Sequence, residues 1–211
     1  MSQVTDLSVR EFSARLASGD PTPGGGSAAA LAGALGSGLV VMVCNFTVGR
    51  DKYADVEEEM RGVLERAEQL RWELEQSVED DVAAYGSYAA AQKLPRETGD
   101  EQRARAEALD AALRESTLVP LGVAERCAQL LELALRAAEL GNRFLISDAA
   151  VGAELAAAGQ SSAELNVRLN LGGIEDEGFT REVSERLSAV AARGRELVDR
   201  TIAVVEERAA G

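Results

Sequence analysis

The apolar residues of this chain recur every three or four positions over most of its length, which is the spacing of helices that bury one face. Between residues 52 and 92 the recurrence is a heptad stripe, the pattern of a long helix that packs against another helix. Leu94-Pro95 ends the pattern, because the residue before a proline disfavours helical geometry. The stripe comprises Tyr53, Val56, Met60, Val63, Ala67, Leu70 and Leu74, and its continuation comprises Ser77, Asp81, Ala84 and Tyr88.

The same spacing predicts further helices, whose ends are inferred from single residues. Helices are expected at about residues 100–115, 119–140 and 175–208, with Pro120 in a first turn, where its missing N–H is tolerated. Ser147 or Asp148 is expected to cap another helix that runs to about residue 158, and Gly159 to separate it from the stretch ending in NVRLNLGGI. The chain is therefore predicted to be all-α, a helical bundle formed by a single domain over residues 1–211.

A run without charged residues extends from Ser27 to Gly49 and is long enough to span a bilayer. Against a membrane span, the run is rich in alanine and glycine, contains Asn45 and Thr47, and has no aromatic belt. Small residues let helices approach each other closely, which suits the centre of a bundle. We therefore expect a buried central helix here, and no membrane partner.

Composition narrows the classes of function. The formal net charge of −14 opposes binding to nucleic acids and to anionic lipid surfaces. The chain contains no histidine, so Ser-His triads and the usual zinc sites are excluded, no metal is expected, and proton transfer is left to other side chains.

Cys44 and Cys127 lie in apolar helical patterns without a CxxC spacing, which is typical of buried thiols in a reducing compartment. The N-terminus, with Leu7, Phe12 and Leu16 on a short amphipathic helix, lacks the features of a secretion signal, so a cytoplasmic location is expected.

The stretch PTPGGGSAAALAGALGSG precedes the uncharged run and matches phosphate-binding motifs only in part. A P-loop needs lysine followed by serine or threonine after its last glycine, and that lysine is missing between Gly26 and Ser27. A GxGxxA match exists at Gly24, Gly26 and Ala29, but no strand pattern precedes it. With Ser27 as the N-cap, Gly24, Gly25 and Gly26 would present backbone N–H groups at the positive end of a helix, which suits a carboxylate or a polarised carbonyl. A tight turn that allows close helix packing explains the glycines equally well.

Asp81 falls on the apolar heptad stripe, whereas Glu79 and Asp80 fall beside it. A carboxylate on such a stripe must find hydrogen-bond donors or becomes harder to ionise, and either outcome can produce an acid–base group. An ion pair with an arginine or lysine from a neighbouring helix is the alternative. Asp81 is therefore the sharpest candidate for a catalytic residue.

A further group of candidate site residues lies late in the chain. Asn166 and Asn170 are four positions apart, so on a helix they share one face. Two amides on one face can bind a planar heterocycle through paired donors and acceptors. Asn142 and Asp148 belong to the same group, although helix capping and surface polarity explain all four residues equally well.

Five blocks of the chain, by their order and spacing, resemble the formiminotransferase-cyclodeaminase family, specifically its cyclodeaminase domain and the free-standing bacterial methenyltetrahydrofolate cyclohydrolases. The resemblance covers the chain from about residue 6 onward. It implies an all-helical, dimeric, folate-binding fold that acts on one-carbon derivatives of tetrahydrofolate. The blocks are PTPGGGSAAALAGALG, TVGRDKY, VEDDVAAYGSYAAAQKLP, LGNRFLISDAAVGAELAAAG and NVRLNLGGIEDEGF.

The resemblance also implies roles for individual residues. The aspartate implicated in catalysis matches Asp81 in the block VEDDVAAY. Two departures from the family pattern bear on substrate choice: Asp51 interrupts the basic cluster of Arg50 and Lys52, and Glu79 stands where many members have aspartate. The implied folate cleft comprises Gly24, Gly25, Gly26, Ser27, Asn142, Asp148, Asn166 and Asn170.

The reaction expected from the resemblance is the hydrolysis of 5,10-methenyltetrahydrofolate to 10-formyltetrahydrofolate, or the cyclisation of 5-formiminotetrahydrofolate with loss of ammonia. Both pass through a tetrahedral carbon between two nitrogens, and Asp81 would move the proton. Arg50 and Lys52 would bind the glutamate tail of the folate, with a solvated structural pair as the alternative. No cofactor beyond the tetrahydrofolate substrate is expected, and a homodimer is. The alternative functions are non-catalytic folate binding and a structural helical dimer.

Overall fold

The computed structural model describes residues 3–210, and every regular element within that range is helical, which confirms the all-α prediction. Short 3-10 helices, labelled η, precede α1 and lie between α2 and α3 and between α4 and α5. The elements are η1 (Val4–Asp6), α1 (Val9–Leu16), α2 (Gly25–Asn45), η2 (Asp51–Val56), α3 (Glu57–Gln92), α4 (Gly99–Leu140), η3 (Arg143–Leu145), α5 (Ile146–Leu171) and α6 (Glu177–Ala210).

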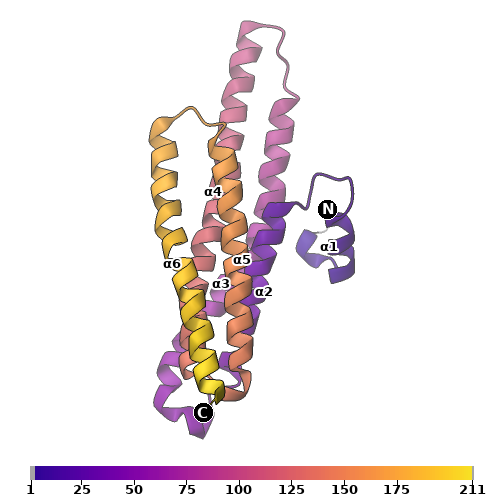
Figure 1. Cartoon of the computed structure of the whole chain (residues 1–211). Helices are drawn as coiled ribbons and strands as arrows, with labels where there is room; N and C mark the ends of the chain where they lie inside the picture. Colours follow the sequence, from indigo (N-terminus) through magenta and orange to yellow (C-terminus); the bar gives the residue numbers. More distant parts are fainter. Residues whose placement is uncertain (1–2, 211) are drawn as a thin grey trace.

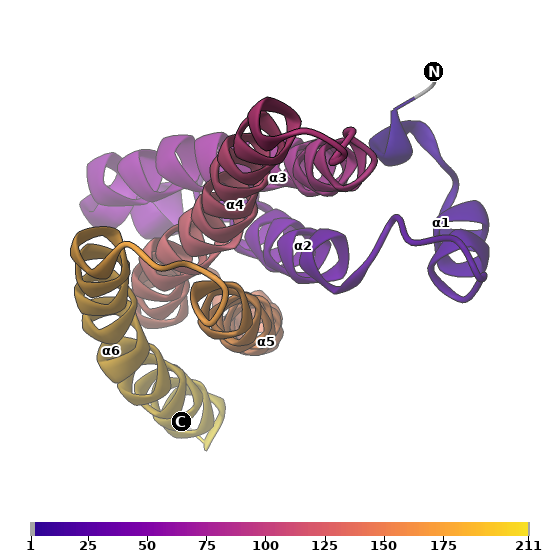
Figure 2. The same ribbon diagram turned by 90° about the horizontal axis from the view of Figure 1, so that it is seen from above.

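Helices α2 to α6 form an elongated bundle in which α4 contacts each of the other four helices, and α2 contacts α3, α4 and α5 (Figure 1). Helix α6 packs on α4 and α5. Helices α3 and α4 form a hairpin whose tip extends beyond the ends of the other helices (Figure 1). Helix α1 lies to one side of the bundle, near the start of α2 (Figure 2), and none of its residues is buried.

From Met60 onward the heptad stripe predicted between residues 52 and 92 follows the buried face of α3, whereas its first two residues, Tyr53 and Val56, lie in η2. Met60, Leu70 and Leu74 have no exposed surface, and they pack among residues of the neighbouring helices. Helix α6 buries its own apolar stripe in the same way, as a helix that packs one face against the bundle does. The buried residues of α6 are Val183, Leu187, Gly194, Leu197, Val198 and Thr201.

The uncharged helix α2 is largely buried, as predicted, but the helix that contacts all the other helices of the bundle is α4. The length and composition of α2 would suffice to cross a membrane, but 61% of its most apolar window is buried inside the protein. Its glycines allow neighbouring helices to come close: a Cβ atom on Gly36 would lie 2.6 Å from the carbonyl oxygen of Gly152 in α5. A Cβ atom on Gly33 would lie 2.7 Å from the Sγ atom of Cys127 in α4. Small residues thus set the spacing around α2.

Two helix boundaries predicted from the sequence are wrong. Pro120 lies in the interior of α4, so the helices expected at residues 100–115 and 119–140 are one helix. Gly159 lies inside α5 instead of separating two segments. A Cβ atom on Gly159 would lie 2.8 Å from the carbonyl oxygen of Ala29 and 3.1 Å from the Cys127 Sγ atom, so this glycine serves close helix packing. Tertiary packing outweighs the low helix propensity of both residues.

The helix starts match the predictions only in part. Helix α4 begins with a capping box, in which Thr98 and Glu101 each bond the other's backbone N–H. Helix α5 begins at Ile146, so Ser147 and Asp148 lie in its first turn and neither is its N-cap, contrary to the prediction. A carboxylate in the first turn still suits the positive end of a helix dipole.

Candidate active site at the start of helix α2

A pocket of about 390 Å³ opens where the start of α2 meets α3, α4 and α5. It contains the predicted residues Gly24, Gly25, Gly26, Asp81, Asn166 and Asn170. Asp81 is the one carboxylate or basic side chain among the described residues that line it. The remaining lining residues are Pro21, Thr22, Ala84, Tyr85, Tyr88, Leu113, Ser116, Val119 and Pro120.

Ser27 holds the carboxylate of Asp81 at the start of α2. The backbone N–H of Ser27 donates to Asp81 Oδ2 at 2.8 Å, and its hydroxyl donates to the same oxygen at 2.7 Å. Ser27 is not the N-cap that the sequence suggested, because the helix begins at Gly25 and Gly24 is the N-cap. Gly24 has no side chain to accept a hydrogen bond, so Asp81 of α3 provides the acceptor that a capping side chain normally provides.

Gly26 allows Asp81 to come this close. A Cβ atom on Gly26 would overlap Asp81 Oδ1 and would lie 2.6 Å from Asp81 Cγ, whereas a Cβ atom on Gly25 would meet no atom within 4 Å. Within residues 3–210, the hydrogen bonds to Asp81 reach only Oδ2. The half-buried carboxylate is thus fixed through one oxygen, and Oδ1 remains available to a ligand.

The backbone N–H groups of Gly25 and Gly26 are the first two of α2. The first N–H groups of a helix have no partner within the helix, and no other described residue accepts a hydrogen bond from these two. Both glycines line the pocket beside Asp81. N–H groups at a helix N-terminus bind oxygen atoms that carry negative charge, so the pocket pairs a carboxylate with a site for an oxyanion.

Asn166 and Asn170 share one face of α5, as predicted, and this face lines the pocket opposite Asp81's own helix. Asn170 Nδ2 donates to the backbone carbonyl of Ser116 in α4 at 2.6 Å. Both asparagines are half-buried. Two amides beside a carboxylate can recognise a heterocycle that carries both donors and acceptors.

Sequence reasoning missed the aromatic part of the site. Tyr85 and Tyr88 lie four and seven positions after Asp81 on α3, so all three side chains are on one helix face, and both tyrosines line the pocket. Tyr88 was on the predicted heptad stripe, so its spacing from Asp81 was the signal that could have identified it. Tyrosine rings supply flat apolar surface for a planar ligand.

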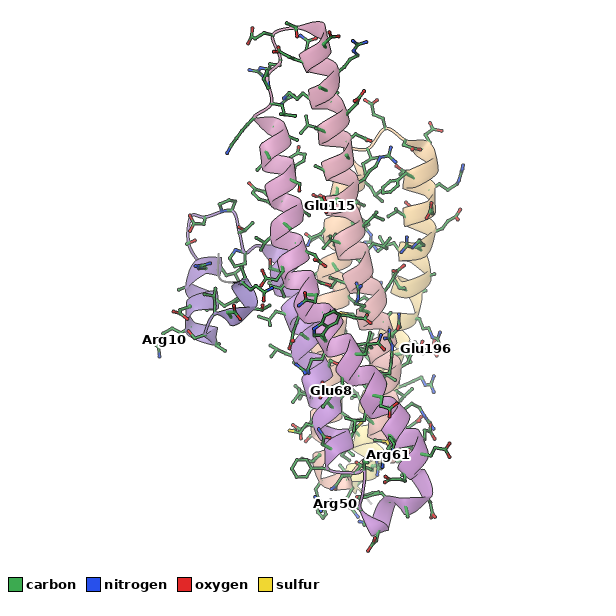
Figure 3. The ribbon with its side chains drawn as sticks, turned by 180° about the vertical axis from the view of Figure 1, so that it is seen from behind. Arg10, Arg50, Arg61, Glu68, Glu115 and Glu196 are labelled. Atoms are coloured by element: carbon green, nitrogen blue, oxygen red, sulfur yellow. The ribbon has the colours of Figure 1, made fainter. Side chains whose placement is uncertain are left out.

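Four other predicted residues lie at the opposite end of α2 or follow it. Helix α2 has 21 residues, so at about 1.5 Å per residue its two ends are about 30 Å apart. Figure 3 shows Arg50 near the end of the bundle remote from Glu115, which adjoins the pocket residue Ser116. A single chain therefore does not bring this group to the pocket. The group comprises Arg50, Lys52, Asn142 and Asp148.

Asn142 has structural hydrogen bonds at that end. Its Oδ1 accepts from the Tyr53 hydroxyl at 3.3 Å and from the Phe144 backbone N–H at 3.1 Å. Its Nδ2 donates to the Phe46 carbonyl at 3.1 Å, and its backbone N–H donates to Thr47 Oγ1 at 2.9 Å. These bonds join the turn after α2 to the turn before α5, and Asn142 is the N-cap of η3. Asn142 therefore has the capping role that the sequence left open as an alternative to substrate binding.

Glu79 ties the N-terminal segment to α3. Its Oε1 accepts from the backbone N–H of Thr5 at 2.8 Å and from the Thr5 hydroxyl at 2.9 Å. The same segment continues to Pro21 and Thr22, which form part of the pocket wall. No cluster of three or more histidine, cysteine, aspartate or glutamate side chains in the described part of the chain is arranged to hold a metal ion.

The sequence around this pocket matches a known family. The model of the formiminotransferase-cyclodeaminase family matches residues 8–189 of the chain. The chain belongs to the formiminotransferase-cyclodeaminase family. The matched range contains every residue that lines the pocket, so the site lies within the part that the family shares.

Individual relatives support the same assignment. A methenyltetrahydrofolate cyclohydrolase of Methylorubrum extorquens is 42% identical over 200 residues, which are 95% of this chain and 96% of that protein. The formimidoyltransferase-cyclodeaminase of Rattus norvegicus is 33% identical over 185 residues, which are 88% of this chain but only 34% of the rat protein. The crystal structure of formiminotetrahydrofolate cyclodeaminase from Thermotoga maritima superposes with a TM-score of 0.87 at 32% identity, over 97% of this chain and 98% of that one.

Proposed function

We propose that this protein hydrolyses 5,10-methenyltetrahydrofolate to 10-formyltetrahydrofolate, with Asp81 as the catalytic acid–base group. The observation that carries the proposal is the Asp81 carboxylate, fixed by Ser27 at the start of α2 in a pocket otherwise free of charged side chains. The choice of hydrolysis is supported by the cyclohydrolase of Methylorubrum extorquens, which this chain resembles over nearly the whole length of both proteins.

The charge of the substrate fits this pocket. The methenyl bridge carries a positive charge shared by N5, the bridge carbon and N10. In the proposed complex this cation lies beside the carboxylate of Asp81, the one charged side chain among the described residues that line the pocket, and the opposite charges attract each other. The flat pterin ring has Tyr85 and Tyr88 to pack against and the amides of Asn166 and Asn170 to bond with.

The proposed reaction uses the Asp81 carboxylate to transfer a proton and the N–H groups at the start of α2 to bind an oxygen atom. Asp81 Oδ1 takes a proton from a water molecule as its oxygen bonds to the bridge carbon, and a tetrahedral carbon forms. The N–H groups of Gly25 and Gly26 bind the oxygen on that carbon. Asp81 then returns the proton to N5 as the C–N5 bond breaks. The oxygen becomes the formyl oxygen, and its own proton goes to solvent, so atoms and charge balance.

Replacing Asp81 with asparagine tests the proposal. Asp81→Asn keeps the size of the side chain but removes the proton acceptor, and we expect the rate of hydrolysis to fall by roughly 100- to 10,000-fold. The rate is measured as the loss of absorbance of the methenyl form. The matched control is Asp80→Asn, which changes the neighbouring exposed carboxylate outside the pocket and is expected to leave the rate unchanged.

Two outcomes would contradict the proposal in different ways. If the wild-type protein leaves the decay at its spontaneous rate, the hydrolysis itself is refuted. If the wild type is active and Asp81→Asn is equally active, the assignment of Asp81 is refuted while the reaction stands. A thermal-shift measurement with folates then separates binding without turnover from absence of binding.

Cyclodeamination of 5-formiminotetrahydrofolate is the second candidate reaction. It is favoured by the fold, which matches the formiminotetrahydrofolate cyclodeaminase of Thermotoga maritima over almost all of both chains. The same carboxylate would donate a proton to the departing ammonia after N10 attacks the formimino carbon. Release of ammonia from the formimino substrate, with formation of the methenyl absorbance, would identify this activity.

The homodimer implied by the family resemblance stays a prediction. It is supported by large apolar side chains that remain exposed on the adjoining helices α2 and α5, among them Leu35, Val151 and Leu165, and by Phe46 directly after α2. A second copy of the chain packed on this side of the bundle would remove them from water.

A further inference from the structure

Helix α4 carries a proline in its interior, and this proline adjoins the pocket. Pro120 is buried and lines the pocket within the continuous helix Gly99–Leu140. Proline has no backbone N–H, so the carbonyl four residues earlier, that of Ser116, loses the hydrogen bond that an α-helix would give it. This carbonyl is part-buried, so another donor in place of the missing N–H is favourable.

Asn170 provides that donor from another helix. Its Nδ2 lies 2.6 Å from the Ser116 carbonyl oxygen. A carbonyl can only accept, so the amide must turn its NH₂ toward Ser116 and its oxygen away. Asn166, one turn earlier on α5, accepts and donates no side-chain hydrogen bond within the described residues, so its amide is not fixed in this way.

We infer that Pro120 is a positioning residue, which frees the Ser116 carbonyl and thereby fixes Asn170 as a hydrogen-bond acceptor in the pocket. Within residues 3–210 no donor reaches Asn170 Oδ1. The inference rests on the proposed function, and it identifies which edge of the substrate binds beside Asn170. The pterin ring carries adjacent N–H donors at N3 and at the 2-amino group, and a fixed Oδ1 binds such an edge. A freely turning amide would present NH₂ to it half of the time.

Pro120→Ala restores the missing N–H and tests the inference. The helix can then satisfy the Ser116 carbonyl itself, and Asn170 loses its fixed orientation. We expect KM for methenyltetrahydrofolate to rise by about three- to tenfold, the effect of one neutral hydrogen bond, with kcat within about twofold of the wild type. The melting temperature should not fall, because alanine is a far better helix former than proline. A higher KM would therefore not result from unfolding.

A double-mutant cycle separates positioning from direct contact, since Pro120 also lines the pocket. Asn170→Ala should raise KM by a similar factor, and adding Pro120→Ala to Asn170→Ala should raise it no further. If the two effects multiply, Pro120 acts through its own contact with the ligand and the inference is overturned. The control is Pro95→Ala, which replaces an exposed proline of the loop between α3 and α4 and should leave KM unchanged.

The outcomes distinguish this inference from the proposed function. An active wild type whose KM is unaffected by Pro120→Ala overturns the inference and leaves the function intact. A wild type without turnover on either candidate substrate overturns the function, and with it the inference. A rise in KM that requires Asn170 supports both.

Discussion

The Asp81 carboxylate lies so close to the backbone of Gly26 that a methyl group at position 26 would overlap it. In Gly26→Ala the carboxylate must move, although the Ser27 N–H and hydroxyl are still present. We expect kcat/KM to fall by about 100-fold, because a shift of about 1 Å in a catalytic group has an effect of that size. Steady-state kinetics on the methenyl substrate measures it.

A second glycine on the same pair of helices gives the control for that variant. Gly86 is an exposed glycine of α3 near the pocket, and a Cβ atom there would meet no atom within 4 Å. Gly86→Ala should therefore keep both activity and stability. Equal activity of Gly26→Ala and Gly86→Ala would show that the approach of Asp81 to α2 is not needed for turnover.

Single residues of the site were predictable where their spacing in the sequence made them stand out. Asp81 broke an apolar stripe, and Asn166 and Asn170 stood one helical turn apart, so their candidacy followed from spacing alone. The partner of Asp81 did not follow, because Ser27 is 54 residues away in the chain and reaches Asp81 only through the packing of α2 on α3.

Backbone contact between α2 and α5 decides how these elements pack. A Cβ atom on Gly36 would lie 2.6 Å from the Gly152 carbonyl oxygen, whereas one on Gly38 would meet no atom within 4 Å. We expect Gly36→Ala to lower the free energy of unfolding by about 1–3 kcal/mol through overpacking. Gly38→Ala should be neutral or should stabilise by up to about 1 kcal/mol, through helix propensity. Urea denaturation of both variants tests this, and a stable Gly36→Ala would show that α2 and α5 can separate at low cost.

The positions of most helices were predictable, but the continuity of α4 and α5 was not. Pro120 and Gly159 are helix-breaking residues by local propensity, and local propensity was the only guide that the sequence offered. In the bundle, α4 has buried residues both before and after Pro120, and α5 has them both before and after Gly159. Asn170 also donates a hydrogen bond to the Ser116 carbonyl that Pro120 leaves free. Packing against neighbouring helices stabilises α4 and α5 across these residues, and the local sequence around each residue does not show that packing.

At the scale of the whole molecule, the core has two parts, and each contains one cysteine. Cys44 packs with Met60 and Leu130, whereas Cys127 packs with Leu74 and Leu121 near the pocket. Burial raises the pKa of each thiol from its ordinary value of 9.0 to about 12. The thiolate is the reactive form, so both cysteines should be inert in the folded protein at pH 8 and reactive in denaturant. A thiol-labelling time course measures this, and labelling of either cysteine without denaturant would contradict the burial.

The same raised pKa values predict how stability depends on alkaline pH. The unfolded thiols ionise near pH 9 and the folded ones near pH 12, so the stabilisation is complete below about pH 9 and is lost as the pH rises toward 12. Urea unfolding at pH 8 and pH 10 should show the decrease. A variant with both Cys44→Ala and Cys127→Ala should show a smaller one, and an equal decrease would assign the effect to other groups.

By itself the sequence determined the all-helical class, the buried faces and the largely buried uncharged helix, because the period of apolar residues is a local property of the chain. Only the tertiary structure decided which polar candidates share a pocket. It joined Gly26, Asp81 and Asn170 from three helices and left Arg50 and Asn142 at the other end of α2. The physical reason is that such distances depend on how helices pack, which is set by contacts between residues far apart in the chain.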